Sequence, residues 1–328
     1  MKISPVEDLF SVINDTATIL QEELSITFLE ALAETGENIF QEAILQDEEI
    51  SELSKKRLKK SYESLKLDRF TVEEIRKSFQ LAILKGMKES VQPNHQMTPD
   101  AVGMLVGYLV NKFVTKTSYR LFDPAIGTGN LLTTVINQQA GKQIEGMGID
   151  VDDLLIKLAF INANLQQHPI ELYNQDSLEP LFIELADAVV SDLPVGYYPN
   201  DVRAAEFQLK SDKGHSYAHH LFIEQSIKYT KDGGYLFFII PNGLFESEEA
   251  PKLHEFLKEH AYIQSILQLP LTMFRHENAA KSVLILQKKG EEVKAPKQVL
   301  LVNLPSLSNG HQVEKTLKKI DQWIKENK

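Results

Sequence analysis

From Tyr119 onward, short apolar runs alternate with helical stretches, and few folds accommodate such a pattern. The candidate strands are residues 119–122, 144–149, 170–173, 188–191, 235–240, 263–267 and 282–286. The alternation predicts an α/β fold with a Rossmann-like, doubly wound, mostly parallel sheet of seven strands. Residues 300–303 are a candidate further edge strand, and residues 313–326 are expected to close the chain as a helix.

The region before this alternation has helical spacing and no strand pattern of any length. Its first apolar residues recur at helical intervals: Val6, Leu9, Phe10, Ile13 and Leu20. Residues 71–74 have the form of a capping box, in which the first and last side chains bond to each other's backbone. We therefore predict a helical N-terminal domain at residues 1–92 and a Rossmann-like domain at residues 93–328.

The second domain is expected to begin with a linker and a helix start. Residues 91–96 read as the linker. Thr98 is then in position for an N-cap, with Pro99 at the first helical position, where proline is favoured.

Composition limits the classes of protein to which the chain can belong. It has no cysteines, which excludes disulfides and thiolate metal sites. No signal peptide and no run of about 18 apolar residues is apparent, so we expect a cytoplasmic protein without membrane contact. The net charge of −11 lowers the expectation of tight, unaided DNA binding. The most basic stretch, residues 55–60, fits either a solvated helix face or a phosphate contact.

A tight turn follows the first predicted strand. It has the sequence DPAIGTG over residues 123–129, and a helix opens at Asn130. Gly127 and Gly129 let the backbone approach a ligand without Cβ clashes, and the N-terminus of the next helix favours an anionic group. Open α/β sheets bind ligands at this position, although an ordinary strand-to-helix turn fits the two glycines about equally well.

Acidic residues at three successive strand ends favour a ligand site. Asp123 ends the first strand, Asp150 ends the second, where an acid can meet ribose hydroxyls, and Asp176 follows the third. A dinucleotide fingerprint would need a small residue in place of Leu132, and the chain has no phosphate loop ending in Gly-Lys-Ser/Thr. S-adenosylmethionine is therefore favoured over a dinucleotide or a nucleoside triphosphate.

A series of motifs runs through residues 90–290 in a fixed order. The motifs are QMTP at 96–99, FDPAIGTGNLL at 122–132, GID at 148–150, QDS at 175–177, GGY at 233–235, IPNG at 240–243 and SVLIL at 282–286. In this order they resemble the amino-methylating N6-adenine DNA methyltransferases, and most of all the methylation subunit of type I restriction–modification systems. The resemblance implies a class I methyltransferase fold and an enzyme that uses S-adenosylmethionine.

The resemblance also implies which residues hold the cofactor. The Thr-Pro segment and the glycine loop would cradle the methionine part, Asp150 the ribose and Asp176 the adenine. The expected cofactor contacts are Thr98, Asp123, Ala125, Gly127, Thr128, Gly129, Asp150, Val151, Asp176 and Asp192.

The family's catalytic motif, Asn/Asp-Pro-Pro-Tyr/Phe, has a diverged counterpart at the end of the fourth strand. The chain has Asp192-Leu193-Pro194-Val195 there, so the implied catalytic residues are Asp192, Leu193 and Pro194. An exocyclic amine is a poor nucleophile, and the acidic side chain and the next carbonyl accept its hydrogens. The family's aromatic residue stacks on the flipped base.

Val195 removes that stacking ring, a contact worth about 1–3 kcal/mol per base. Tyr197 or Tyr198 is a candidate substitute, and packing within the loop is the simpler interpretation of both. The predicted function is a methyltransferase resembling the N6-adenine enzymes. The alternatives are a diverged, non-catalytic S-adenosylmethionine-binding protein and a methyltransferase for a different amine.

Two further expectations concern partners and metals. About 38 residues follow position 290, too few for a target-recognition domain, and the family obtains sequence specificity from a partner subunit. DNA binding is therefore expected to be weak or to depend on a specificity partner. His219 and His220 are adjacent and point to different faces of a helix, so no metal site is expected.

Overall fold

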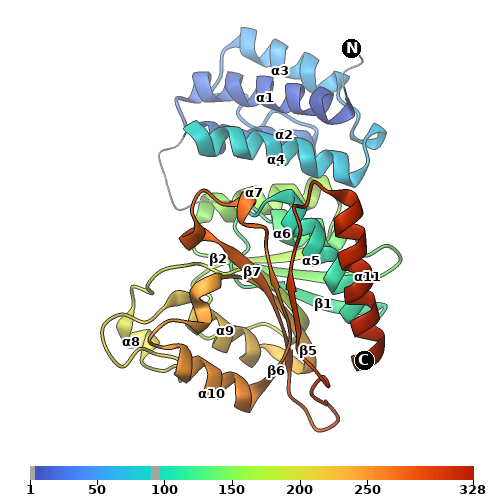
Figure 1. Ribbon diagram of the computed structural model, residues 1–328. Coiled ribbons are helices and arrows are strands. Elements are labelled where there is room, and N and C mark those ends of the chain that lie inside the picture. The colour runs from blue at the N-terminus through green and yellow to red at the C-terminus, as the bar shows by residue number, and fades with distance from the viewer. Residues whose placement is uncertain (1–3, 90–96) are drawn as a thin grey trace.

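The computed structural model describes residues 4–89 and 97–328. The predicted domain boundary between residues 92 and 93 and the predicted linker lie outside these residues. Figure 1 shows the N-terminal helices as a layer above an α/β body.

A mixed sheet forms the centre of the described α/β body. Its eight strands are ordered β3-β2-β1-β4-β5-β7-β6-β8. The bounds are β1 (Ser118–Asp123), β2 (Gln143–Asp150), β3 (Ile170–Asn174), β4 (Ala186–Asp192), β5 (Thr230–Pro241), β6 (Ala261–Gln268), β7 (Lys281–Lys288) and β8 (Leu300–Asn303). The predicted doubly wound, mostly parallel sheet is confirmed, and the predicted edge strand makes the eighth.

Strand direction decides which residues meet at one edge of the sheet. The strands β3, β2, β1, β4 and β5 are parallel, whereas β7 is antiparallel to both β5 and β6. The chain moves outward from β1 to β2 and β3 and then returns to β4, so the direction of winding switches between β1 and β4. A crevice is expected where their carboxyl ends diverge. Because β7 is antiparallel, its first residue lies at that same edge.

Helices cover both faces of the sheet. They are α5 (Asp100–Phe113), α6 (Asn130–Asn137), α7 (Asp153–Leu165), α8 (Asp201–Ala204), α9 (Ala218–Lys228), α10 (Ala250–His260) and α11 (Gly310–Asn327). Short 3₁₀ turns occur at Leu67–Arg69, Asn242–Phe245, Leu271–Met273 and Glu277–Ala279.

The central strand β5 is buried on both faces. Phe237 and Ile239 pack in a core with α5, α6 and α11, and Leu236, Phe238 and Ile240 pack in a second core with α9 and α10. Figure 1 shows these helix groups on opposite sides of the sheet. Burial on both faces explains why the strand is a continuous apolar run.

The N-terminal layer contains α1 (Pro5–Leu24), α2 (Phe28–Gln41), α3 (Glu52–Ser64) and α4 (Val72–Glu89). The predicted capping box opens α4: the Thr71 N–H donates to Glu74 at 2.8 Å, and the Glu74 N–H donates to the Thr71 hydroxyl at 3.2 Å. Thr27 and Glu30 form the same arrangement before α2. These boxes satisfy backbone donors that a helix start leaves without partners.

The helical layer packs closely on the α/β body through α2 and α7. A Cβ at Gly36 of α2 would lie 2.3 Å from Ile161 Cγ2 of α7, a distance that no real side chain tolerates. Leu158, Ile161 and Leu165 of α7 complete the apolar core of the layer. The two regions therefore share one core at this contact.

A fully buried arginine joins α4 to the α/β body. Arg76 Nη2 donates to Glu73 and, at 2.6 Å, to Asp100. Its Nη1 donates to Asn130 Oδ1 at 2.8 Å. Asn130 is the first residue of α6 and follows the glycine loop directly. The helical layer is thus bonded to the start of the helix that the loop introduces.

The predicted N-cap role of Thr98 is wrong. The helix α5 begins at Asp100, and its N-cap is Pro99, whose side chain makes no capping hydrogen bond. Thr98 instead donates its hydroxyl to Asp192 Oδ2 at 3.0 Å. Because α5 starts one residue later than predicted, its N-cap position falls on Pro99 and not on Thr98.

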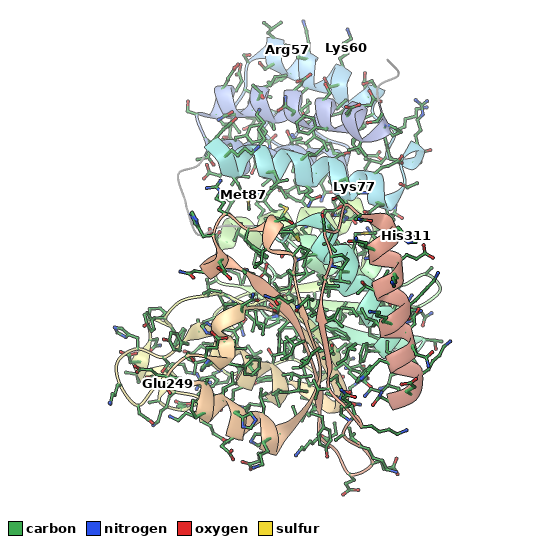
Figure 2. The ribbon with its side chains drawn as sticks, in the orientation of Figure 1. Arg57, Lys60, Lys77, Met87, Glu249 and His311 are labelled. Carbon is green, nitrogen blue, oxygen red and sulfur yellow. The ribbon has the colours of Figure 1, made fainter. Side chains whose placement is uncertain are left out.

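The basic run at residues 55–60 lies on α3, at the outer side of the helical layer. Leu58 is its buried residue, and Lys55 forms ion pairs with Asp47 and Glu52. Arg57 and Lys60 project outward at the top of Figure 2.

Within residues 4–89 and 97–328, no helix is long and apolar enough to cross a bilayer.

Candidate functional site

A cavity of about 560 Å³ opens at the sheet edge where the winding direction switches. The predicted site residues that line it are Thr98, Asp123, Ala125, Gly127, Thr128, Asp150, Val151, Asp192, Leu193 and Pro194. They come from β1, β2, β4 and the segments next to them, so the parallel strands bring distant parts of the sequence together. Gly129 and Asp176 are not among its lining residues.

The glycine loop follows β1 directly. Gly127 and Gly129 have φ values of 54° and 75°, in the left-handed region that favours glycine. Apart from Gly127 itself and its two chain neighbours, no described residue has an atom within 4 Å of an ideal Cβ at this position, which lines the cavity. At Gly129 such a Cβ would lie 3.3 Å from the Ala159 Cβ of α7. Gly127 therefore leaves space for a ligand, and Gly129 permits close packing behind the loop.

Asp123 supports the loop from inside the protein. It is 1% exposed, and its Oδ1 accepts from the Ser191 hydroxyl at 2.8 Å and from the Ala125 N–H at 3.1 Å. Burial raises the pKa of Asp123 to about 7, and the charges of Asp150 and Asp192 act in the same direction. The two hydrogen bonds oppose this rise in pKa.

Asp150 closes the other side of the loop. Its Oδ2 accepts from the Gly127 N–H at 2.8 Å, and its Oδ1 accepts from the Asp152 N–H at 3.1 Å. A carboxylate has about four acceptor positions, so both oxygens can still accept from hydroxyl groups. The neighbouring Val151 is 69% exposed and presents apolar surface at the cavity.

Asp176 is bonded away from the cavity wall. Its Oδ1 accepts from the Leu178 N–H at 2.9 Å, and its Oδ2 accepts from the Tyr198 hydroxyl at 2.5 Å. Burial and the neighbouring Asp176 raise the pKa of Tyr198, which keeps its hydroxyl protonated as the donor. Asp176 thus fixes the segment that follows Asp192-Leu193-Pro194-Val195.

Asp192 ends β4, and both of its carboxylate oxygens have partners. Thr98 donates to Oδ2 at 3.0 Å, and the Lys281 ammonium donates to Oδ1 at 2.6 Å. The backbone of the motif is fixed where the Leu193 N–H donates to the Ile239 carbonyl at 3.2 Å. Three polar side chains from distant parts of the sequence, those of Thr98, Asp192 and Lys281, therefore meet at the cavity.

The sequence alone does not single out Lys281. Site residues in a parallel sheet are expected at the carboxyl ends of strands, whereas Lys281 is the first residue of β7. The pairing Pro241↔Lys281 brings it beside the end of β5. In the sequence, Lys281 is a single lysine at the start of an apolar strand. It can be assigned to the site only once the direction of that strand is known.

The two tyrosines after the motif differ in environment. Tyr198 is 5% exposed and packs inside the protein, whereas Tyr197 is 62% exposed. The Tyr197 ring stacks on Tyr217 with a centroid distance of 5.1 Å and an interplanar angle of 15°. Val195 is 59% exposed at the cavity. Tyr197 is therefore the tyrosine with an accessible face.

The histidines of α9 are buried beside these rings. His219 and His220 meet edge to face at 4.9 Å, and burial lowers the pKa of each to about 4. Both are therefore neutral at pH 7. In the part of the chain that the structure describes, no group of three or more candidate ligands is arranged to hold a metal ion.

Two family models match the chain. The N-6 DNA Methylase model matches residues 89–326, and a model described as the YtxK N-terminal helical domain matches residues 7–87. The chain is 50% identical to the uncharacterized protein YtxK of Bacillus subtilis (strain 168) over 329 residues, which cover 100% of each protein.

Two solved structures share the fold of this chain. A candidate class I S-adenosylmethionine-dependent methyltransferase from Listeria monocytogenes is 48% identical, with a TM-score of 0.91 over 98% of this chain and 99% of that one. The type I restriction–modification methyltransferase subunit from Streptococcus thermophilus shares the fold at 18% identity, with a TM-score of 0.69 over 97% of this chain and 74% of that one. The chain therefore belongs to the N-6 DNA Methylase family and has the class I methyltransferase fold.

Proposed function

We propose that the chain transfers a methyl group from S-adenosylmethionine to an amine, with N6 of adenine in DNA as the leading acceptor. One observation carries this proposal: the glycine loop and Asp192 line the same cavity of about 560 Å³. Small-molecule sites have volumes of roughly 300–1,000 Å³. Membership in the N-6 DNA Methylase family supports adenine as the acceptor.

The residues around the cavity fit the proposed cofactor. A side chain at Gly127 would enter the space beside the loop, which only a glycine leaves open. Asp150 retains acceptor positions for ribose hydroxyls, and Val151 offers apolar surface to the adenine ring. Thr98 and the loop residues Ala125 and Thr128 are proposed to contact the methionine part.

Gly129 and Asp176 take indirect roles in this proposal. Gly129 allows the loop to pack against Ala159, and Asp176 anchors Tyr198 through the 2.5 Å hydrogen bond. Both then shape the cofactor site without lining the cavity.

The bound cofactor supplies an electrophilic methyl group on a sulfonium, and the chain's own residues orient the acceptor. In this proposal, a carboxylate oxygen of Asp192 accepts one hydrogen of the amine, and the Leu193 carbonyl accepts the other. Pro194 restricts the backbone after them. Holding amine and methyl group in line supplies most of the rate in such a direct transfer.

Base stacking is proposed to come from outside the four-residue motif. Val195 has no ring, and Tyr198 is buried. The exposed face of Tyr197 is the remaining candidate, with Tyr217 stacked behind it. Stacking of a base on such a ring is worth about 1–3 kcal/mol.

A non-catalytic cofactor-binding protein is the second candidate function. The observation in its favour is the ion pair between Asp192 and Lys281, which fills an acceptor position at the proposed catalytic carboxylate. A methyltransferase for a different amine is consistent with the same pair and with Val195.

The proposal extends to partners, location and domain roles. With a net charge of −11, DNA contact is proposed to be weak or to depend on a specificity partner, in the cytoplasm. The helical domain at residues 1–92 and the Rossmann-like domain at residues 93–328 are proposed as the two structural units.

The deciding experiment incubates the protein with labelled S-adenosylmethionine and unmethylated DNA and measures N6-methyladenine. We expect transfer by the native protein and none by Asp192→Ala. If calorimetry shows cofactor binding but no label reaches DNA or RNA, the adenine proposal is wrong, and the non-catalytic protein and the methyltransferase for a different amine are the two functions left. If no cofactor binds, the methyltransferase proposal itself fails.

A further inference from the structure

The Asp192 carboxylate is engaged by an ammonium group that belongs to the protein itself. Lys281 Nζ lies 2.6 Å from Asp192 Oδ1, and both side chains line the cavity. They are largely shielded from water, with side-chain exposures of 25% for Lys281 and 18% for Asp192. An ion pair in such a place is screened less than one on the surface.

The backbone beneath Lys281 is held firmly. Its carbonyl accepts from the Leu269 N–H at 3.1 Å, and the next residue, Ser282, donates its hydroxyl to Asn242 Oδ1 at 2.7 Å. The antiparallel pairing of β7 with β5 fixes the register, with Lys281 opposite Pro241. The lysine is therefore directed to this edge by strand pairing, while its side chain remains long enough to move away.

The Lys281 ammonium has N–H donors, and so does a substrate amine that receives the methyl group. In the proposed function, the substrate amine must donate to a carboxylate oxygen of Asp192. Oδ2 already accepts from Thr98 and Oδ1 from Lys281, so each oxygen keeps one further acceptor position and a cation holds the first position on Oδ1. A neutral amine forms a weaker hydrogen bond with a carboxylate than an ammonium does. Such an amine therefore takes the position of Lys281 on Oδ1 only when other contacts hold it there, and otherwise has only the remaining acceptor positions of Asp192.

We propose that Lys281 is a specificity-determining residue that occupies the amine-acceptor oxygen of Asp192 until a ligand bearing its own amine displaces it. This inference rests on the proposed function, because it assigns Asp192 as the amine acceptor. It predicts that a ligand amine beside Asp192 Oδ1 competes with the Lys281 ammonium. Substrates without further contacts are thereby excluded.

The test measures the affinities of three cofactor analogues by calorimetry in the native protein and in Lys281→Met. S-adenosylhomocysteine has neither a charge nor an amine at the reacting position. S-adenosylmethionine has a positive charge there but no N–H donor. Sinefungin carries an ammonium on carbon at that position and so has both the charge and the donors.

Removal of Lys281 frees Asp192 for the sinefungin amine. We expect sinefungin to bind about tenfold more tightly to Lys281→Met, the usual size of one charge-assisted hydrogen bond. S-adenosylmethionine is expected to gain less, since it gains only from the loss of a nearby positive charge. S-adenosylhomocysteine is expected to be nearly unchanged.

Two variants serve as matched controls. Lys281→Arg keeps a cation beside Asp192 and is expected to keep the native ratio of affinities. Lys288→Met removes a lysine from the other end of β7, where Lys288 bonds to the Thr230 carbonyl at 2.7 Å, and is expected to leave all three affinities unchanged. Thermal unfolding checks that each variant is folded.

The outcomes separate this inference from the proposed function. Equal gains for sinefungin and S-adenosylmethionine in Lys281→Met show a purely electrostatic effect and overturn the inference. A sinefungin affinity that does not rise overturns it as well, and in both cases cofactor binding survives. If none of the three analogues binds the native protein, the proposed function fails first.

Discussion

Gly127 combines a φ of 54° with open space around its missing side chain, since no described residue other than its chain neighbours has an atom within 4 Å of an ideal Cβ. The position lines the cavity, so a methyl group there would meet a ligand rather than the protein. Gly141 has a similar φ of 76° and the same open surroundings among the described residues, but it lies in the turn before β2 and does not line the cavity. Gly141 is therefore a matched control for Gly127.

Gly127→Ala is expected to weaken S-adenosylmethionine binding at least tenfold, because its Cβ enters the cofactor space. Gly141→Ala should cost a similar left-handed backbone strain, about 1 kcal/mol, with unchanged affinity. Calorimetry gives the affinities, and urea unfolding gives the strain. Equal affinities in the two variants would contradict the assignment of the loop.

The raised pKa of Asp123 predicts that the stability of the protein depends on pH. Its folded pKa of about 7 lies above the ordinary value of 3.8, so the folded protein holds a proton that the unfolded chain releases. This contribution to stability is fully present below about pH 4 and is lost as pH rises through 7. Asp123→Asn mimics the protonated side chain, and its unfolding free energy should fall less between pH 5 and pH 8 than that of the native protein.

Urea unfolding at the two pH values measures the difference, which we expect to be on the order of 1–3 kcal/mol. A parallel pH dependence in the native and Asp123→Asn proteins would show that another group is responsible.

At the scale of elements, α4 is attached to the α/β body by a charged group in a buried position. Arg76 has no exposed side-chain surface and bonds to α5 through Asp100 and to α6 through Asn130. Its neighbour Lys77 is 42% exposed and pairs with Glu73 at 3.5 Å. Figure 2 shows Lys77 at the boundary between the helical layer and the α/β body.

Arg76→Met is expected to lower the free energy of unfolding by about 3 kcal/mol, because two carboxylates and an amide lose their buried partner. Lys77→Met removes an exposed pair and should change it by less than about 0.5 kcal/mol. Chemical denaturation compares the two. A loss below about 1 kcal/mol for Arg76→Met would mean that apolar packing alone joins the layers.

At the scale of the whole molecule, charge sets a limit on DNA binding. With a net charge of −11, the isolated chain is expected to bind duplex DNA no more tightly than the roughly 10⁻⁴–10⁻⁶ M typical of non-specific contacts at physiological salt. Fluorescence anisotropy with a labelled duplex, repeated from about 50 to 200 mM salt, checks this value. Submicromolar binding at the higher salt by the chain alone would remove the need for a specificity partner.

The sequence by itself determined the order of strands and helices, the capping box at Thr71, and the glycine loop with its acidic strand ends. These features depend on local periodicity and on short-range backbone chemistry, which a linear pattern records. The strand 282–286 was also predicted, although its direction was not.

Tertiary structure alone decided what meets at the site. Only the antiparallel direction of β7 brings Lys281 to Asp192, 89 residues earlier in the chain. Likewise, only the folded chain brings the Thr98 hydroxyl to Asp192 at a distant strand end, while the N-cap position of α5 falls on Pro99. Contacts between residues far apart in sequence depend on strand pairing and burial, and local patterns do not encode them.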